Sequence, residues 1–178
     1  MFNLYLTITE FAFFGPMAYD VAALIQNLIL NHLSHYGHTL DSTEREPYQA
    51  YLLEMTHDIW TGFAEKFEAL WVADNRGEAV PAAYWAFPGG DEAFATYRQR
   101  YMLRLLQQTA LHGGTKFLRR MLGVVTVWDI SSIEDTERRA IAERAAIQIG
   151  TRWILEHGQY TSIDDLLAVV REETAGLG

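Results

Sequence analysis

The sequence predicts a mainly α-helical fold that forms one domain over residues 1–178. Apolar residues recur at helical spacing through most of the chain, and Ser, Thr or Asp capping signals precede several of these stretches. The chain has 178 residues, of which 49% are hydrophobic, so it is long enough to bury a core. No repeat, low-complexity tract or linker divides it.

The N-terminus is the one stretch with a strand pattern. Phe2, Leu4, Leu6 and Ile8 alternate with other residues, and Gly15-Pro16 then forces a turn. A lone strand leaves its backbone hydrogen bonds unsatisfied. We therefore expect either a hairpin with the following "FAFF" or a pairing partner outside this sequence.

Two long helices are expected next. Residues 18–36 are apolar on nearly every side, which is typical of a buried helix. Thr43-x-x-Glu46 is a capping-box pattern that opens a helix to Trp71, with an aromatic and aliphatic stripe that favours core packing over a stacking platform. Residues 74–90 form the one extended irregular segment.

The sequence pattern predicts four more helices in the second half of the chain. Asp91 caps a helix to about residue 110, and the "HGG" at 112–114 separates it from a helix over 115–125. Ser132-x-x-Asp135 opens a helix to about residue 157, and Thr161-x-x-Asp164 opens the last. The final "TAGLG" is expected to fray.

Composition excludes several classes of function. The formal charge of −9, from 14 Lys and Arg against 23 Asp and Glu, argues against a general nucleic-acid or anionic-membrane surface. No apolar stretch approaches the roughly 20 residues that span a bilayer, and no secretory signal is seen. Without cysteine there is no disulfide or thiolate metal site, and a cytoplasmic location is expected.

The candidate site is the arginine pair Arg119 and Arg120. In a helix over 115–125, the two arginines lie opposite the apolar face, with Lys116 and Gly123 beside them. A residue without a side chain between cations leaves room for an anion to approach. The alternative is a solvated basic face, which is what most charge runs are.

Other candidate sites are weaker. His32, His35 and His38 invite a metal site, but no carboxylate lies among them at ligand spacing, and a histidine-rich helix end is the better account. The Gly-Gly pairs at 89–90 and 113–114 lack the spacing and the lysine of a phosphate-binding loop.

Three stretches together resemble one family. "EFAFFGPMAYDVAALIQNLIL", "YLLEMTHDIWTGFAEKFEALW" and "KFLRRMLGVVTVWDISSIED" are similar, in this order, to the C-terminal part of S-methyl-5-thioribose kinase. The resemblance extends over about residues 10 to 157. It implies the helical part of the C-terminal lobe of a protein-kinase-like fold, with a residual N-terminal strand or hairpin. It also implies a family that phosphorylates a small sugar in methionine salvage, with ATP and Mg²⁺.

The resemblance also assigns residues. The family's paired arginines, which contact the sugar and the transferred phosphoryl group, fall on Arg119 and Arg120. Its metal-binding Asp-Pro-Glu falls on Ile8-Thr9-Glu10, so that Glu10 alone keeps an oxygen ligand for Mg²⁺. The family's Gly-rich loop, ATP-pairing lysine and catalytic aspartate lie upstream of this motif, and Met1 stands only a few residues before it.

Two hypotheses follow. In the first, the chain belongs to this phosphotransferase family, keeps a substrate-side surface at Arg119 and Arg120, and is inactive alone because it lacks the nucleotide site and the catalytic aspartate. In the second, it is a non-catalytic helical module that retains the fold and self-associates or binds a partner. In both, the strand edge and the apolar surface beside it favour a homo-oligomer.

Overall fold

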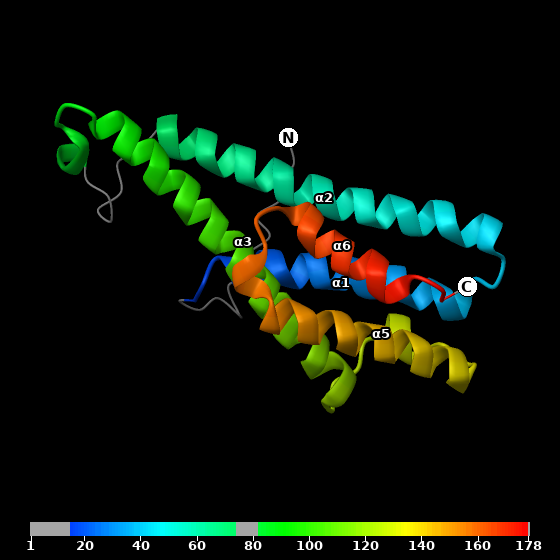
Figure 1. The fold of residues 1–178 in the computed structure, drawn as a ribbon. Helices are drawn as coiled ribbons and strands as arrows, with labels where there is room; N and C mark the ends of the chain where they lie inside the picture. The colour runs from blue at the N-terminus through cyan, green and yellow to red at the C-terminus, as the bar shows by residue number, and fades with distance from the viewer. Residues whose placement is uncertain (1–14, 74–81, 178) are drawn as a thin grey trace, which may run out of the picture.

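The described structure consists of helices. The computed structural model describes residues 15–73 and 82–177, and Figure 1 shows their arrangement. The elements are α1 (Ala18–His38), α2 (Ser42–Ala73), the 3₁₀ helix η2 (Ala82–Trp85), α3 (Gly90–Leu122), α4 (Trp128–Ser131), α5 (Thr136–Leu155), the 3₁₀ helix η3 (His157–Gln159) and α6 (Ile163–Thr174). The predicted mainly α fold is confirmed, whereas the predicted strand over residues 2–8 lies outside the described residues.

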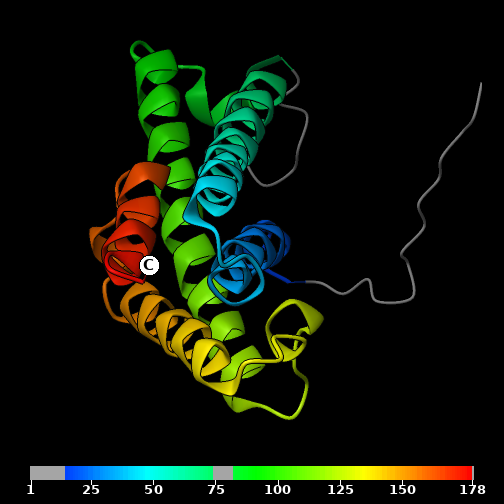
Figure 2. The ribbon, with the colours of Figure 1, turned by 90° about the vertical axis from the view of Figure 1, so that its right-hand side faces the viewer.

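Helix α1 is the centre of the arrangement. It packs against α2, α3 and α5, and Figure 2 shows it nearly end-on with these three helices around it. Ile25, Ile29 and Leu33 are fully buried, as the apolar composition of this stretch predicts. Only a narrow strip that includes Leu24 and Asn27 faces solvent. The buried-helix prediction for residues 18–36 is therefore right for most of the helix circumference.

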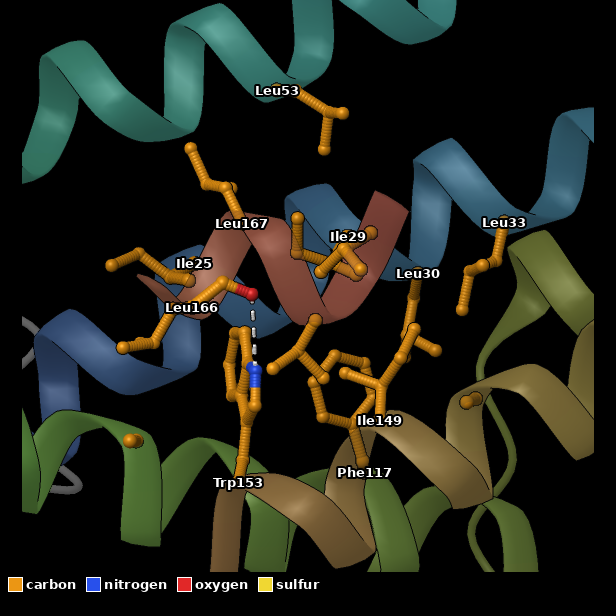
Figure 3. Close-up of a cluster of buried hydrophobic side chains, with 14 of the residues drawn as sticks. Ile25, Ile29, Leu30, Leu33, Leu53, Phe117, Ile149, Trp153, Leu166 and Leu167 are labelled. Carbon is orange, nitrogen blue, oxygen red and sulfur yellow. Dashed lines mark hydrogen bonds between the residues drawn. The ribbon is translucent and has the colours of Figure 1, made fainter. Parts of the chain in front are cut away.

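The core lies where α3 and α5 meet α1 and α6. Figure 3 shows the indole of Trp153 standing in this core, where its Nε1 donates a hydrogen bond to the backbone oxygen of Leu166 at 3.3 Å. The ring of Phe117 meets the indole edge-on, with centroids 5.4 Å apart. Each large apolar side chain buried in this way contributes about 1.5–3 kcal/mol to folding. The core thus ties the end of α3 to α5.

The structure corrects the predicted break at "HGG". Residues 91–110 and 115–125 do not form two helices, because α3 continues through Gly113 and Gly114 to Leu122. Both glycines are buried against α5, and a Cβ on Gly114 would lie 2.5 Å from the backbone oxygen of Gly150. These glycines permit a close helix contact and do not end a helix. Val124 lies beyond the helix and is fully exposed, so the predicted apolar face over 117–125 is wrong at its end.

The caps lie one or more residues away from their predicted positions. Asp41, rather than Thr43, accepts the hydrogen bond from a first-turn N–H of α2, that of Thr43 at 2.8 Å. Asp135 caps α5 through two backbone N–H groups, and the capping box of α6 pairs Ser162 with Asp165. Glu and Asp side chains at these starts also complement the helix dipole. The sequence therefore predicted these helices correctly, but it placed their capping residues one to three positions away from where the structure has them.

The far ends of α2 and α3 project beyond the core and are joined by aromatic contacts. Figure 1 shows this projecting pair on its left side. Phe67 stacks on Tyr101 with centroids 6.1 Å apart, and Trp71 meets Tyr97 and Tyr101 edge-on at 5.9 and 5.0 Å. The aromatic stripe of α2 therefore packs as predicted at this end. Nearer the start of α2, Tyr51 is 53% exposed and is not packed into the core as predicted.

No helix among residues 15–73 and 82–177 is long and apolar enough to cross a membrane.

The contact between α3 and α5 gives a test with a matched control. The substitution Gly114→Ala should destabilise the protein by roughly 1–3 kcal/mol, because the new methyl group overlaps backbone that cannot turn away. Gly62→Ala, in α2, meets no atom within 4 Å and should stabilise it by roughly 0.5–1 kcal/mol. Urea unfolding followed by circular dichroism measures both free energies. Equal stability of the two variants would contradict the role given to Gly114.

Candidate functional site

Arg119 and Arg120 lie in the last turn of α3, as cations favoured by the helix dipole. The helix ends at Gly123, whose N–H bonds to the backbone oxygen of Arg119 at 3.1 Å. A Cβ on Gly123 would lie 2.3 Å from that same oxygen. Glycine is therefore required here by the helix end itself. The expectation that this glycine leaves room for a ligand has no support in the geometry.

The two guanidinium groups are available to a ligand. Arg119 is exposed and Arg120 is half-buried. Within residues 15–73 and 82–177, neither side chain makes an ion pair or a hydrogen bond. Arg152, by contrast, bonds to Glu172 at 2.7 Å and to Glu173 at 3.0 Å. Two free cations in one helical turn form a surface that can accept an anion.

The start of α1 adds an aromatic ring to this surface. The Nζ of Lys116 lies 3.5 Å from the centroid of the Tyr19 ring, a cation–π contact. His112, one turn earlier on α3, meets the same ring edge-on at 5.9 Å. The hydrogen bond and charge of Lys116, helped by the charge of Arg119, lower the pKa of the Tyr19 phenol. Burial, together with the charge of Lys116, lowers the pKa of His112, which favours its neutral form.

Gly15 and Pro16, just before α1, lie beside a part of α3 that precedes its last turn. Gly15 and Pro16 border a cavity of about 580 Å³ that is also lined by Tyr97 and Arg104. Arg104 precedes Arg119 by roughly 22 Å along α3, at 1.5 Å per residue. The first turn of α1, rather than the turn before it, thus approaches the end of α3.

The predicted metal ligand Glu10 lies outside the described residues. Among the residues described, no cluster of three or more His, Asp or Glu side chains could hold a metal ion. The three histidines of α1 serve separate structural roles. His32 bonds to the backbone oxygen of Gln49 at 3.1 Å, His35 to the Thr39 hydroxyl at 3.0 Å and His38 to the backbone oxygen of Asp129 at 2.8 Å. Burial lowers the pKa of His32 to about 4, so its ring is neutral near pH 7.

Sequence reasoning missed Tyr19 and His112 as neighbours of the arginines. His112 and Lys116 stand four residues apart, but this spacing means a shared face only if the helix runs through Gly113 and Gly114. Placing Tyr19 beside them requires the packing of α1 on α3, which no local pattern specifies.

Comparison with known proteins gives one consistent relationship. No family model matches the chain. Methylthioribose kinase 2 of rice (Oryza sativa subsp. japonica) is 34% identical over 165 residues, which are 91% of this chain and 38% of the rice protein. Methylthioribose kinase 1 of rice is also 34% identical, and the Escherichia coli enzyme is 29% identical over 158 residues. These matches cover 37% of each of those two proteins.

The chain thus spans well under half the length of the curated relatives that it matches, while nine-tenths of its own sequence takes part in the match. It is therefore related to the methylthioribose kinases through a shared part that corresponds to a little more than a third of their length.

Proposed function

We propose that this chain provides the substrate-side surface of a methylthioribose kinase-type phosphotransferase, with Arg119 and Arg120 binding the sugar and the transferred phosphoryl group. The proposal rests on one observation above all. In a chain related to part of these kinases, two arginines without partners among the described residues stand together in the last turn of α3.

The chemistry of phosphoryl transfer suits such a pair. The reaction depends mostly on positioning and on neutralising the negative charge of the transferred oxygens. The guanidinium group is planar, permanently charged and able to donate two parallel hydrogen bonds to one oxyanion. Lys116, one turn earlier, adds a third positive charge next to Tyr19. The end of α3 would therefore hold a phosphorylated sugar by its anionic end.

The described residues do not fit the ATP and Mg²⁺ that the relatives' name implies. Gly113 and Gly114 lie inside α3 and are buried against α5, so they cannot cradle phosphates as a glycine-rich loop does. No described cluster of carboxylates could hold a metal ion. We therefore propose that the chain needs a complementary nucleotide-binding part to act as a kinase.

The first test is removal of the two guanidinium groups. The double variant Arg119→Ala/Arg120→Ala should bind methylthioribose 1-phosphate at least about 10-fold more weakly, because charge-assisted hydrogen bonds to the phosphate are lost. Its free energy of unfolding should change by less than about 0.5 kcal/mol, since neither arginine has a partner among the described residues. Isothermal titration calorimetry and urea unfolding measure the two quantities.

Arg100→Ala is the matched control, because Arg100 is an exposed arginine of the same helix, far from its C-terminal end. It should leave the affinity unchanged. Full affinity in the double variant, or an equal loss in the control, would exclude the arginine pair as the binding surface.

The second test is activity. The purified chain should not transfer phosphate from ATP to methylthioribose in the presence of Mg²⁺. Ile8, at the position that the family resemblance gives to a metal-binding aspartate, has no oxygen to offer. Without positioning and charge neutralisation, the rate should fall by many orders of magnitude. A coupled assay for ADP measures this. Turnover by the wild-type chain that Glu10→Ala abolishes would overturn the proposal.

The alternative function is self-association through a non-catalytic helical module. One observation favours it: Leu122, Val124 and Trp128, just beyond the arginines, are 70%, 100% and 81% exposed. Large apolar side chains gathered in seven residues of chain are typical of a surface that another protein covers. A net charge of −9 opposes unlimited aggregation and favours a discrete dimer.

Sedimentation velocity tests this alternative. At tens of micromolar the chain should sediment as a dimer, and Val124→Asp should shift it to the monomer without loss of helical content, because Val124 makes no buried contact in the fold. Reversing the charge of Glu143, a half-buried residue of α5, by Glu143→Arg should leave the dimer intact. A clean monomer for the wild-type chain would exclude self-association.

A further inference from the structure

A second cavity lies at the opposite end of α1 from Tyr19. It has a volume of about 380 Å³ and opens where the start of α2, the start of α5 and the residues after α6 come together. Figure 1 shows these three chain segments meeting on its right side, beside the C-terminus. Tyr36, Arg45, Arg138 and Leu177 are among its lining residues.

The decisive residue in this cavity is Arg45. Its side chain is almost completely buried, with 5% of the residue exposed. It stacks on the Tyr36 ring, with Cζ 5.0 Å from the ring centroid, and donates one long hydrogen bond of 3.4 Å to the backbone oxygen of Thr39. Its Nε is buried without a hydrogen-bond partner. No carboxylate of the residues described here lies within ion-pair distance of it.

An arginine in this position is costly for the free protein. Burying a charge without a counter-ion is unfavourable by several kcal/mol, which the stacking on Tyr36 offsets only in part. Arg45 also stands in the first turn of α2, where the helix dipole disfavours a cation. An anion in the cavity would offset both of these costs.

A second arginine stands beside the first at the mouth of the cavity. Arg138 lies in the first turn of α5 and donates a hydrogen bond to the backbone oxygen of Tyr36 at 3.4 Å. The positive ends of the α2 and α5 dipoles therefore act on the cavity together with two guanidinium groups.

Two carboxylates also line the cavity, and neither of them pairs with Arg45, which has no ion-pair partner in the described part of the chain. One oxygen of Asp135 caps α5, and the other faces Arg138 at 3.5 Å. Glu137 is exposed at the rim. The charge of Arg138 is thus partly offset, whereas that of Arg45 is not.

We propose that this cavity binds a small oxyanion, the phosphate or carboxylate group of a metabolite, with Arg45 as the buried ligand and Arg138 as the ligand at the mouth. The site is separate from the arginine pair at the end of α3 and does not rest on the function proposed for it.

The experiment uses the full chain and two probes, sodium phosphate and sodium acetate, each titrated against chloride at constant ionic strength. Isothermal titration calorimetry measures the affinity, and thermal unfolding measures the gain in stability. We expect at least one probe to bind and to raise the melting temperature. Arg45→Met and Arg138→Met should each weaken that binding at least about 10-fold. Binding of phosphate alone, acetate alone or both supports the proposal and identifies the group.

Two further variants and one rescue make the test specific. Arg139→Met removes the neighbouring arginine of α5, which pairs with Glu143 at 3.9 Å outside the cavity, and should bind as the wild type does. The Arg119→Ala/Arg120→Ala protein should also keep the binding. Arg45→Lys should restore part of it. If Arg45→Met does not fold, Arg138→Met decides the question. Absence of binding by the wild-type chain, or equal binding by wild type and Arg138→Met, would overturn the proposal.

Discussion

The close contact between α3 and α5 is the constraint on which the other features depend. Gly114 and Gly150 let the two backbones approach until no side chain fits between them, and Phe117 and Trp153 fill the space on either side. Because the contact falls within a continuous helix, eight residues before its end, it fixes the direction in which the last turn of α3 points. The position of Arg119 and Arg120 relative to α1 follows from that direction.

Both proposed anion sites are built from arginines that have no ion-pair partner among the described residues, but by different means. At the end of α3 the arginines reach solvent, so that leaving them unpaired costs little and the surface stays open to a large ligand. At Arg45 the guanidinium is buried, and an unpaired charge there is tolerable only because Tyr36 and Thr39 share its solvation. The first arrangement suits a ligand that exchanges with solvent, and the second suits an ion that stays bound.

The local sequence pattern was sufficient to predict most of the helices, but it could not predict the contacts between them. The apolar period of α1 and the stripe of α2 predicted both elements, because burial of a helix face repeats every three to four residues. The Gly113-Gly114 pair predicted a helix break, and this was wrong. Gly114 packs against Gly150, which lies 36 positions later in the chain, so no local pattern could show the contact. The arginine pair was visible in the sequence, but its Tyr19 neighbour was not. Arg45 stands in a polar stretch, "STEREPY", which gives no sign of burial.

The glycine contact with α5 lies near one end of α3, and this has a consequence for how the helix can tilt. The 33 residues of α3 extend roughly 50 Å, and Gly114 lies roughly 9 Å from Arg120 and roughly 30 Å from Phe94 along the helix. A small tilt of α3 about this contact would move its two ends in opposite directions. The aromatic end would move about three times as far as the end that carries the arginines. A displacement of the projecting ends of α2 and α3 would therefore move Arg119 and Arg120 in the opposite direction and by a smaller distance.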